Sequence, residues 1–257
     1  MEGGNAKNAV QIEASGLEPP TSGLQSRRSP RLSCAPTANE YPRRPSPSRH
    51  LSFVFKTVYN VWILCKEGDM KEIRWHGRGG QGAKTVSQIL AQINLREGKH
   101  VQSFPEYGPE RSGAPIRAYN RISDEEILIH SGVYHPDISV VVDESLLESE
   151  NPTEGLKPDG TLVVNTKRSP DEVRRLTGFS GEIVCLDADK IAQEAGAGFP
   201  NVPMLGAVVA VLGSDPKLAE EELRETLSHR LPPEVVEKNL QAFRAGHAAA
   251  KGARQNA

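Results

Sequence analysis

The apolar and polar positions of residues 70–250 follow two periods in turn. Short runs with an apolar residue at every second position, or with consecutive β-branched residues, predict strands. These runs are 71–76, 100–104, 116–122, 127–129, 138–142, 161–165 and 182–186. Between them, apolar residues recur three and four positions apart, which predicts helices; the first such set is Val86, Ile89, Leu90 and Ile93. The alternation predicts an α/β fold: a single domain with a Rossmann-like, mostly parallel sheet and helices on both faces.

Local signals place several element boundaries. Ser169 and Pro170 predict the N-cap and the first position of a helix over 171–176. Segment 207–212 is apolar all round, which predicts a buried helix. We expect strands 116–122 and 127–129, which follow each other closely, to form an antiparallel pair.

Residues 1–69 differ in kind from this domain. The first 50 are rich in Pro, Ser, Gly and Arg and hold too little apolar surface to offset the entropy of ordering, so we expect disorder. Segment 51–65 is apolar but shorter than the roughly 20 residues that span a bilayer. Met70 directly precedes the first strand, so we expect native translation to begin there and residues 1–69 to come from an earlier start codon. A genuine N-terminal extension is the alternative.

Composition narrows the functional classes. The net charge of −2 over 257 residues gives no reason to expect nucleic-acid binding. The 3 cysteines form no CxxC motif and the histidines no HxxxH motif, so we expect neither a disulfide framework nor a metal site. Cys185 lies in a strand and is interpreted as a core residue rather than a nucleophile. A cytoplasmic protein without membrane contact is the expectation.

A glycine-rich turn separates the first strand from the first helix. It reads Gly77-Arg-Gly-Gly-Gln-Gly82 and fits G-x-G-x-x-G at its first, third and sixth positions. A strand, a glycine turn and a helix direct backbone N–H groups and a helix dipole at one point, where a phosphate can bind. A P-loop is excluded because Ala83 separates the last glycine from Lys84.

The dinucleotide interpretation lacks one expected residue, and an alternative interpretation of the turn remains open. A dinucleotide site would place an Asp or Glu about 20 residues on, at the end of the second strand, to hold a ribose hydroxyl. The first carboxylate there is Glu106, which lies beyond a proline. The glycines could instead serve only close packing of the helix against the strand.

The loop 106–115 is polar and contains glycines, prolines and carboxylates around Arg111. Loops that follow strands in α/β folds commonly carry ligand contacts. The alternative is a plain connector in which Arg111 pairs with Glu106 or Glu110 at the surface.

Three stretches together resemble a known family: 74–82 (RWHGRGGQG), 103–115 (SFPEYGPERSGAP) and 201–206 (NVPMLG). They are similar to the gamma subunit, or fused gamma domain, of the 2-oxoacid:ferredoxin oxidoreductases, over roughly residues 70–243. The resemblance implies a complex that decarboxylates a 2-oxoacid on thiamine pyrophosphate. It also implies electron transfer through iron–sulfur clusters to ferredoxin, and acyl transfer to coenzyme A.

The same resemblance implies a division of labour between subunits. Thiamine pyrophosphate sites of this class use a GDG motif for magnesium, which neither 68–70 nor 158–160 provides, and the cysteines are too few for a cluster. We therefore expect thiamine pyrophosphate, magnesium and iron–sulfur clusters on alpha, beta and delta-type partner subunits. Pyruvate is the most common 2-oxoacid of the family, with indolepyruvate and 2-oxoglutarate as alternatives.

What remains for this chain, by resemblance, is coenzyme A binding and assembly of the complex, with no catalytic residue of its own. The candidate coenzyme A-binding residues are Gly77, Arg78, Gly79, Gly80, Gln81, Gly82, Lys84, Thr85, Asn165 and Asn201. Glu106, Tyr107 and Arg111 are expected at the rim that faces the partner's active site. The rival hypotheses are a stand-alone NAD-dependent oxidoreductase and a structural adapter that binds no ligand.

Overall fold

The computed structural model of the chain describes residues 70–106 and 113–255. The expectations for residues 1–69, for Tyr107 and for Arg111 fall outside this range. Within it, the strands are β1 (Lys71–Arg78), β2 (His100–Glu106), β3 (Pro115–Ser123), β4 (Ile138–Val141), β5 (Thr161–Asn165) and β6 (Glu182–Leu186). The helices are α2 (Ala83–Arg96), α3 (Leu146–Ser149), α4 (Pro170–Thr177), α5 (Ala188–Ala195), α6 (Asn201–Leu212), α7 (Pro216–Ser228) and α8 (Pro233–Gln255).

The described strands form one sheet in the order β2-β3-β1-β4-β5-β6. Strands β1, β4, β5 and β6 pair in parallel, whereas β3 pairs antiparallel with both β1 and β2. Strand β3 therefore runs against the other five strands. The prediction of a mostly parallel α/β sheet is confirmed.

The expected antiparallel pair between 116–122 and 127–129 is wrong. Strand β3 finds its two antiparallel partners in β1 and β2, and residues 127–129 form no strand. Leu128 is 76% exposed and Ile129 is 46% exposed. Both edges of β3 are occupied by β1 and β2, so segment 127–129 could not pair with β3 as expected.

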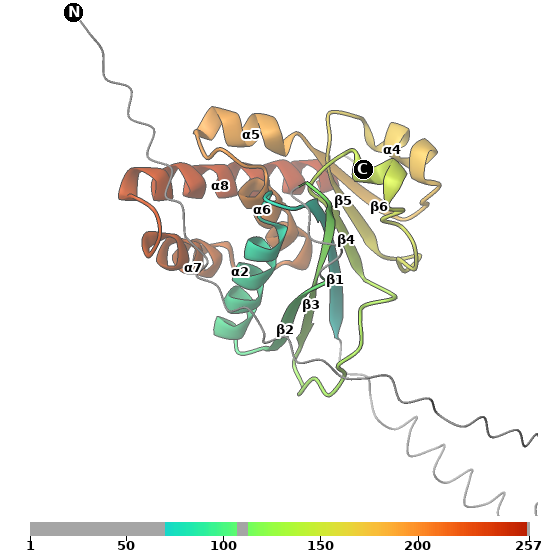
Figure 1. Ribbon diagram of the computed structural model, residues 1–257, viewed down its shortest axis with the longest axis horizontal. Helices are drawn as coiled ribbons and strands as arrows, with labels where there is room; N and C mark the ends of the chain where they lie inside the picture. Colours follow the sequence, from blue (N-terminus) through green and yellow to red (C-terminus); the bar gives the residue numbers. More distant parts are fainter. Residues whose placement is uncertain (1–69, 107–112, 256–257) are drawn as a thin grey trace, which may run out of the picture. The chain divides into compact units, whose positions relative to one another are not determined.

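Helices cover both faces of the sheet (Figure 1), as predicted. On one face, α2, α6 and α8 pack in one hydrophobic cluster with β1 and β4, and α5 and α7 join it from outside. On the other face, α3 and α4 pack over β4, β5 and β6 in a second cluster. The first helix buries its predicted face, since Val86, Ile89, Leu90 and Ile93 are at most 2% exposed. Helix α4 begins with a capping box at Ser169, as its sequence indicated.

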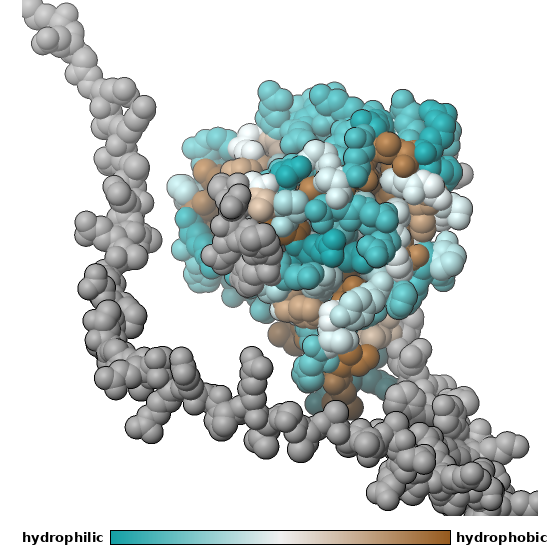
Figure 2. Space-filling view, turned by 45° about the vertical axis from the view of Figure 1, so that its right-hand side comes forward, coloured by the Kyte–Doolittle hydropathy of each residue, from teal (hydrophilic) through white to brown (hydrophobic). Residues whose placement is uncertain are grey.

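Strand β1 presents chemically opposite faces because its residues alternate. Ile73 and Trp75 are completely buried against α2 and its neighbours. Arg74 and His76 point to the other face, where the sheet strands β1, β3 and β2 carry mainly polar side chains. Loops between β3 and β4 and between α3 and β5 lie over this polar face. Figure 2 shows a largely hydrophilic surface, with hydrophobic side chains gathered at its lower end, where the β3–β4 loop lies in Figure 1.

Within the described ranges, no helix is long and apolar enough to cross a membrane.

The packing of α6 against α8 depends on a glycine in α8. A Cβ atom at Gly246 would lie 2.1 Å from the carbonyl oxygen of Pro203 in α6. We expect Gly246→Ala to lower the free energy of unfolding by about 1–3 kcal/mol, because the two helices must move apart. Urea unfolding of the full chain, followed by circular dichroism, measures the change.

The matched control lies in the same helix. A Cβ at Gly252 would meet no atom within 4 Å. Gly252→Ala should therefore raise the free energy of unfolding by about 0.5–1 kcal/mol, as alanine favours a helix over glycine. Equal effects of the two substitutions would contradict the packing argument.

Candidate functional site

The carboxyl ends of β1 and β4 form the switch point of the sheet. From β1 the chain crosses through α2 to β2, on one side of β1; from β4 it passes through α3 to β5, on the other side. Connections that diverge in this way leave a crevice at the ends of the two central strands, where α/β proteins commonly bind ligands. The glycine turn and Asp143 meet there.

The backbone of the glycine turn is partly committed to the chain itself. Because β1 extends to Arg78, the turn proper is Gly79–Gly82, with Gly80 in its middle. The N–H of Gly79 donates to the carbonyl of Ala114 at 2.9 Å, and the N–H of Gln81 donates to the carbonyl of Arg78 at 3.0 Å. These two N–H groups do not point at a ligand, contrary to our expectation for the turn. The donors suited to an anion are those of the first turn of α2, which has no side-chain cap.

Two of the candidate glycines allow close packing. A Cβ at Gly77 would lie 2.9 Å from the Cβ of Ala83, at the start of α2. At Gly82, where φ is 76°, a Cβ would lie 2.3 Å from Nδ2 of Asn201. The strand, the turn and the start of α6 are therefore in contact, and Asn201 adjoins the turn. The packing interpretation holds for these two positions.

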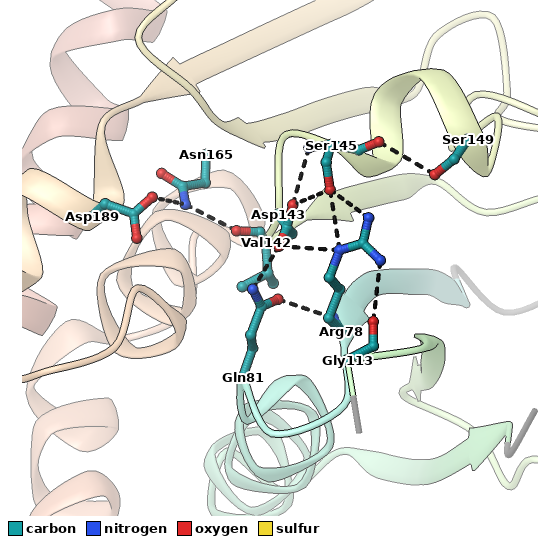
Figure 3. A network of polar contacts seen from close by, with 9 residues as sticks. All are labelled: Arg78, Gln81, Gly113, Val142, Asp143, Ser145, Ser149, Asn165 and Asp189. Atoms are coloured by element: carbon teal, nitrogen blue, oxygen red, sulfur yellow. Dashed lines mark hydrogen bonds and ion pairs between the residues drawn. The ribbon is translucent and has the colours of Figure 1, made fainter. Parts of the chain in front are cut away.

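A polar network links the turn to the end of β4 (Figure 3). The side chain of Gln81 accepts from the N–H of Arg78 at 2.9 Å and donates to Asp143 Oδ2 at 2.6 Å. The guanidinium of Arg78 donates to Ser145 Oγ at 2.6 Å and lies 3.4 Å from Asp143 Oδ2. Burial alone would raise the pKa of Asp143, but the hydrogen bonds from Ser145 and Gln81 and the charge of Arg78 lower it below its usual value. Asp143 is an anion that holds the turn and Arg78 in place.

Asn165 extends the network to α5 (Figure 3). Its Nδ2 donates to the carbonyl of Val142 at 2.9 Å and to Asp189 Oδ2 at 2.8 Å, and its Oδ1 accepts from the N–H of Ala188 at 2.8 Å. Both amide hydrogens are thus used within the chain. Asn165 lies beside the switch point, where it positions the neighbouring elements.

The first turn of α2 carries Lys84 and Thr85. The Lys84 side chain is exposed, and this turn contains no acidic residue. Thr85 instead lines a hollow between α2 and α7, together with Ser103 and Arg230. The structure therefore brings Lys84 to the helix start but turns the Thr85 side chain away from the crevice.

Glu106 belongs to a second cluster, on the polar face of the sheet. It accepts a hydrogen bond from the hydroxyl of Tyr119 and lines a cavity with Arg74 and Arg117. Burial, and after it the bond to Glu106, raises the pKa of Tyr119 to about 12. The predicted rim residue is therefore separate from the glycine turn.

The order of the strands weighs against a dinucleotide site. Strand β2 does end at Glu106, but β3 lies between β1 and β2. A ribose bound beside β1 would meet β3, and Glu106 is already bonded to Tyr119. The carboxylate that a dinucleotide site needs next to β1 is not supplied by β2.

Sequence reasoning missed Asp143, Ser145 and Asp189 as site residues. Asp143 directly follows the predicted strand 138–142, which was the available signal, because carboxyl ends of parallel strands share one edge of the sheet. In the described part of the chain, no group of three His, Cys, Asp or Glu side chains could hold a metal ion. Burial raises the pKa of Cys185 to about 11, so its thiol is not activated.

Comparison with known proteins places the chain in a family. Residues 72–249 match the model of the pyruvate ferredoxin/flavodoxin oxidoreductase family. The chain is 52% identical over 178 residues to the pyruvate synthase subunit PorC of Thermotoga maritima, covering 68% of this chain and 92% of that one. It is 44% identical to the pyruvate/ketoisovalerate oxidoreductases common subunit gamma of Thermococcus kodakarensis, covering 67% and 93%.

A solved structure agrees with these relatives. The crystal structure of the pyruvate oxidoreductase subunit PORC from Thermotoga maritima superposes with a TM-score of 0.63 at 47% identity. The match covers 70% of this chain and 96% of that chain. The chain therefore belongs to the pyruvate ferredoxin/flavodoxin oxidoreductase family, as a gamma-type subunit of an oxidoreductase whose electron acceptor is ferredoxin.

Proposed function

We propose that this chain binds phosphate groups of coenzyme A at the start of α2 and helps to assemble the enzyme that uses them. The enzyme would oxidatively decarboxylate a 2-oxoacid, pyruvate in the first instance, and transfer the acyl group to coenzyme A with ferredoxin as acceptor. Alpha, beta and delta-type partner subunits would carry thiamine pyrophosphate, magnesium and the iron–sulfur clusters. The observation that carries the proposal is an uncapped helix start at the switch point of a chain from this family.

The electrostatics of this helix start support the proposal. A helix N-terminus carries roughly half a positive charge, so an acidic residue there is favourable and a lysine is unfavourable by about 0.3–1 kcal/mol. Helix α2 has Lys84 in its first turn and no acidic residue. A bound phosphate removes this mismatch, because it can accept from the backbone N–H groups and approach the ammonium.

Arg78 supplies a second cation near the turn, but one that is held. Its guanidinium is restrained by Ser145 and by the carbonyl of Gly113, and Asp143 offsets its charge. It is therefore suited to fixing the shape of the turn. Lys84, whose side chain is exposed in the first turn of α2, is the candidate for direct contact with a phosphate.

We expect Lys84→Gln to raise the KM for coenzyme A about tenfold in the assembled enzyme, with kcat at saturating coenzyme A unchanged. The reason is the loss of one charge-assisted contact, worth about 1.5 kcal/mol, that is made equally in the ground state and the transition state. Steady-state kinetics with pyruvate and ferredoxin measure both constants.

A matched control is Lys217→Gln. Lys217 is also exposed in the first turn of a helix, but α7 is capped by its own Asp215. This variant should leave the KM for coenzyme A unchanged.

Dephospho-coenzyme A, which lacks the 3′-phosphate, shows which phosphate Lys84 contacts. The effect of Lys84→Gln disappears with this substrate if the 3′-phosphate is held, and persists if the pyrophosphate is held. An unchanged KM for coenzyme A in Lys84→Gln would refute the phosphate contact.

A structural adapter is the second candidate, because Gly77 and Gly82 serve packing. In that case the glycine turn would only shape the surface that meets a partner subunit. Lys84→Gln would then leave the KM for coenzyme A as it is, so the same measurement separates the two functions.

We expect the isolated chain not to bind NADH. The antiparallel β3 lies between β1 and β2, and no carboxylate from β2 reaches the position that a ribose hydroxyl requires. Titration of NADH fluorescence with the full chain should show neither enhancement nor a blue shift at millimolar nucleotide. A saturable enhancement would restore the dinucleotide hypothesis.

A further inference from the structure

The polar face of the sheet contains a cavity that the proposed function does not use. It has a volume of about 750 Å³, within the range of small-molecule sites. Arg74, Arg117 and Tyr119 line it from the sheet, and Phe104 and Tyr134 supply aromatic rings. The cavity is separate from the start of α2, because α2 packs on the opposite face of β1.

Arg74 lacks a counter-ion of its own. The charged Arg and Glu side chains that are buried in the described part of the chain are Arg74, Arg121 and Glu222. Arg121 pairs with Glu72 at 2.8 Å and Glu222 pairs with Arg96 at 2.5 Å. Arg74 is only 6% exposed and forms no ion pair with any described carboxylate. A buried charge without a counter-ion costs several kcal/mol, which makes this arginine the exception to explain.

The neighbours of Arg74 hold it but do not neutralise it. Its Nε donates to His76 Nε2 at 3.0 Å, and one terminal nitrogen donates to the carbonyl of Pro152 at 3.0 Å and to that of Glu154 at 2.5 Å. All three acceptors are uncharged, since burial and the nearby guanidinium groups of Arg74 and Arg117 lower the pKa of His76 to about 3. His76 Nδ1 is itself buried and has no partner among the described residues.

The other charges around the cavity do not cancel Arg74 directly. Arg117 pairs with Glu150 at 3.1 Å, and one carboxylate oxygen of Glu106 accepts from Tyr119. Burial and the charge of Arg117 lower the pKa of Arg74, and interactions with Tyr119, Glu154 and Glu106 oppose this only in part. The wall of the cavity therefore offers a fixed guanidinium, a second guanidinium close by, and aromatic surface.

We propose that this cavity binds a carboxylate group, with Arg74 and Arg117 as its cationic partners and Phe104 and Tyr134 against the apolar part of the ligand. A planar carboxylate matches the fork of a guanidinium. The carboxylate could belong to a small molecule or to an Asp or Glu side chain of a partner subunit; both offer the same chemistry, and the experiment separates them.

Benzoate is a suitable probe, and benzamide has nearly the same shape without the charge. We expect benzoate to bind the full chain saturably in calorimetry, and benzamide to bind at least tenfold more weakly. Arg74→Gln should abolish the preference for benzoate. Arg244→Gln, which removes an exposed arginine from α8 on the other face of the sheet, should leave it unchanged.

Arg74 also joins loops to the sheet, so its substitution could prevent folding. Arg117→Gln is the second variant, because Arg117 lines the same cavity with its side chain 36% exposed. It should weaken benzoate at least fivefold and leave benzamide as before. Equal affinities for benzoate and benzamide, absence of benzoate binding, or a charge preference that survives in both variants would overturn the proposal.

The assembled enzyme identifies the source of the carboxylate. Benzoate that binds the isolated chain but not the complex indicates a side chain of a partner subunit in the cavity; binding to both indicates a small-molecule site. Saturating coenzyme A should not change the affinity for benzoate, because the two sites lie on opposite faces of the sheet. Failure of either proposal therefore leaves the other testable.

Discussion

The antiparallel strand β3, inserted between β1 and β2, is the constraint on which the rest of the structure depends. It pairs with β1 over the whole length from Lys71 to Arg78 and with β2 over the whole length from His100 to Glu106. Each pairing fixes which side chains share a face, because residues alternate along every strand. As a result the apolar residues of β1 lie under α2, and its polar residues join those of β3 and β2 on the opposite face.

The insertion of β3 also separates two structural features that a dinucleotide-binding sheet places next to each other. In a dinucleotide fold, the glycine turn after the first strand and the carboxylate after the second act on one ligand. Here Glu106 is two strands from β1 and bonded to Tyr119, so it does not lie beside the glycine turn. The turn is instead supported from β4, where Asp143 binds Gln81 and faces Arg78. The G-x-G-x-x-G motif is present, but the carboxylate that supports it follows β4 instead of β2.

The polar face requires a different stabilisation from the apolar one. Buried guanidinium groups need hydrogen-bond acceptors at every position, because burial of a charge is costly. Arg121 receives them from Glu72 and from the carbonyls of Ile129 and Gly132, and Arg74 from the carbonyls of Pro152 and Glu154. These bonds hold two loops over the sheet where no described helix covers it. The same arrangement leaves a cavity whose wall carries charged side chains.

Much of the fold was determined by the sequence alone. Alternation and β-branched runs located all six described strands, and the spacing of Val86, Ile89, Leu90 and Ile93 identified the buried face of α2. The Ser169-Pro170 pair located the start of α4, since a capping box acts within a single turn of the chain. Helix α5 was missed, although Asp187 caps its start and Gly196 ends it. Its buried residues are Ala188 and Ala192, one helical turn apart, and this pattern is too short to indicate a helix.

Tertiary structure decided what these elements do together. The segment 127–129 has the composition of a strand, yet it forms none. Both edges of β3, with which it was expected to pair, are occupied by β1 and β2. Asn165 and Asn201 were expected to contact a ligand; the fold uses the first to join β5 to α5 and places the second against Gly82. Sequence patterns report the local periodicity of burial and the local chemistry of turns. Which edge a strand finds, and which polar groups meet across it, depend on contacts between residues far apart in the chain, and no local pattern carries that information.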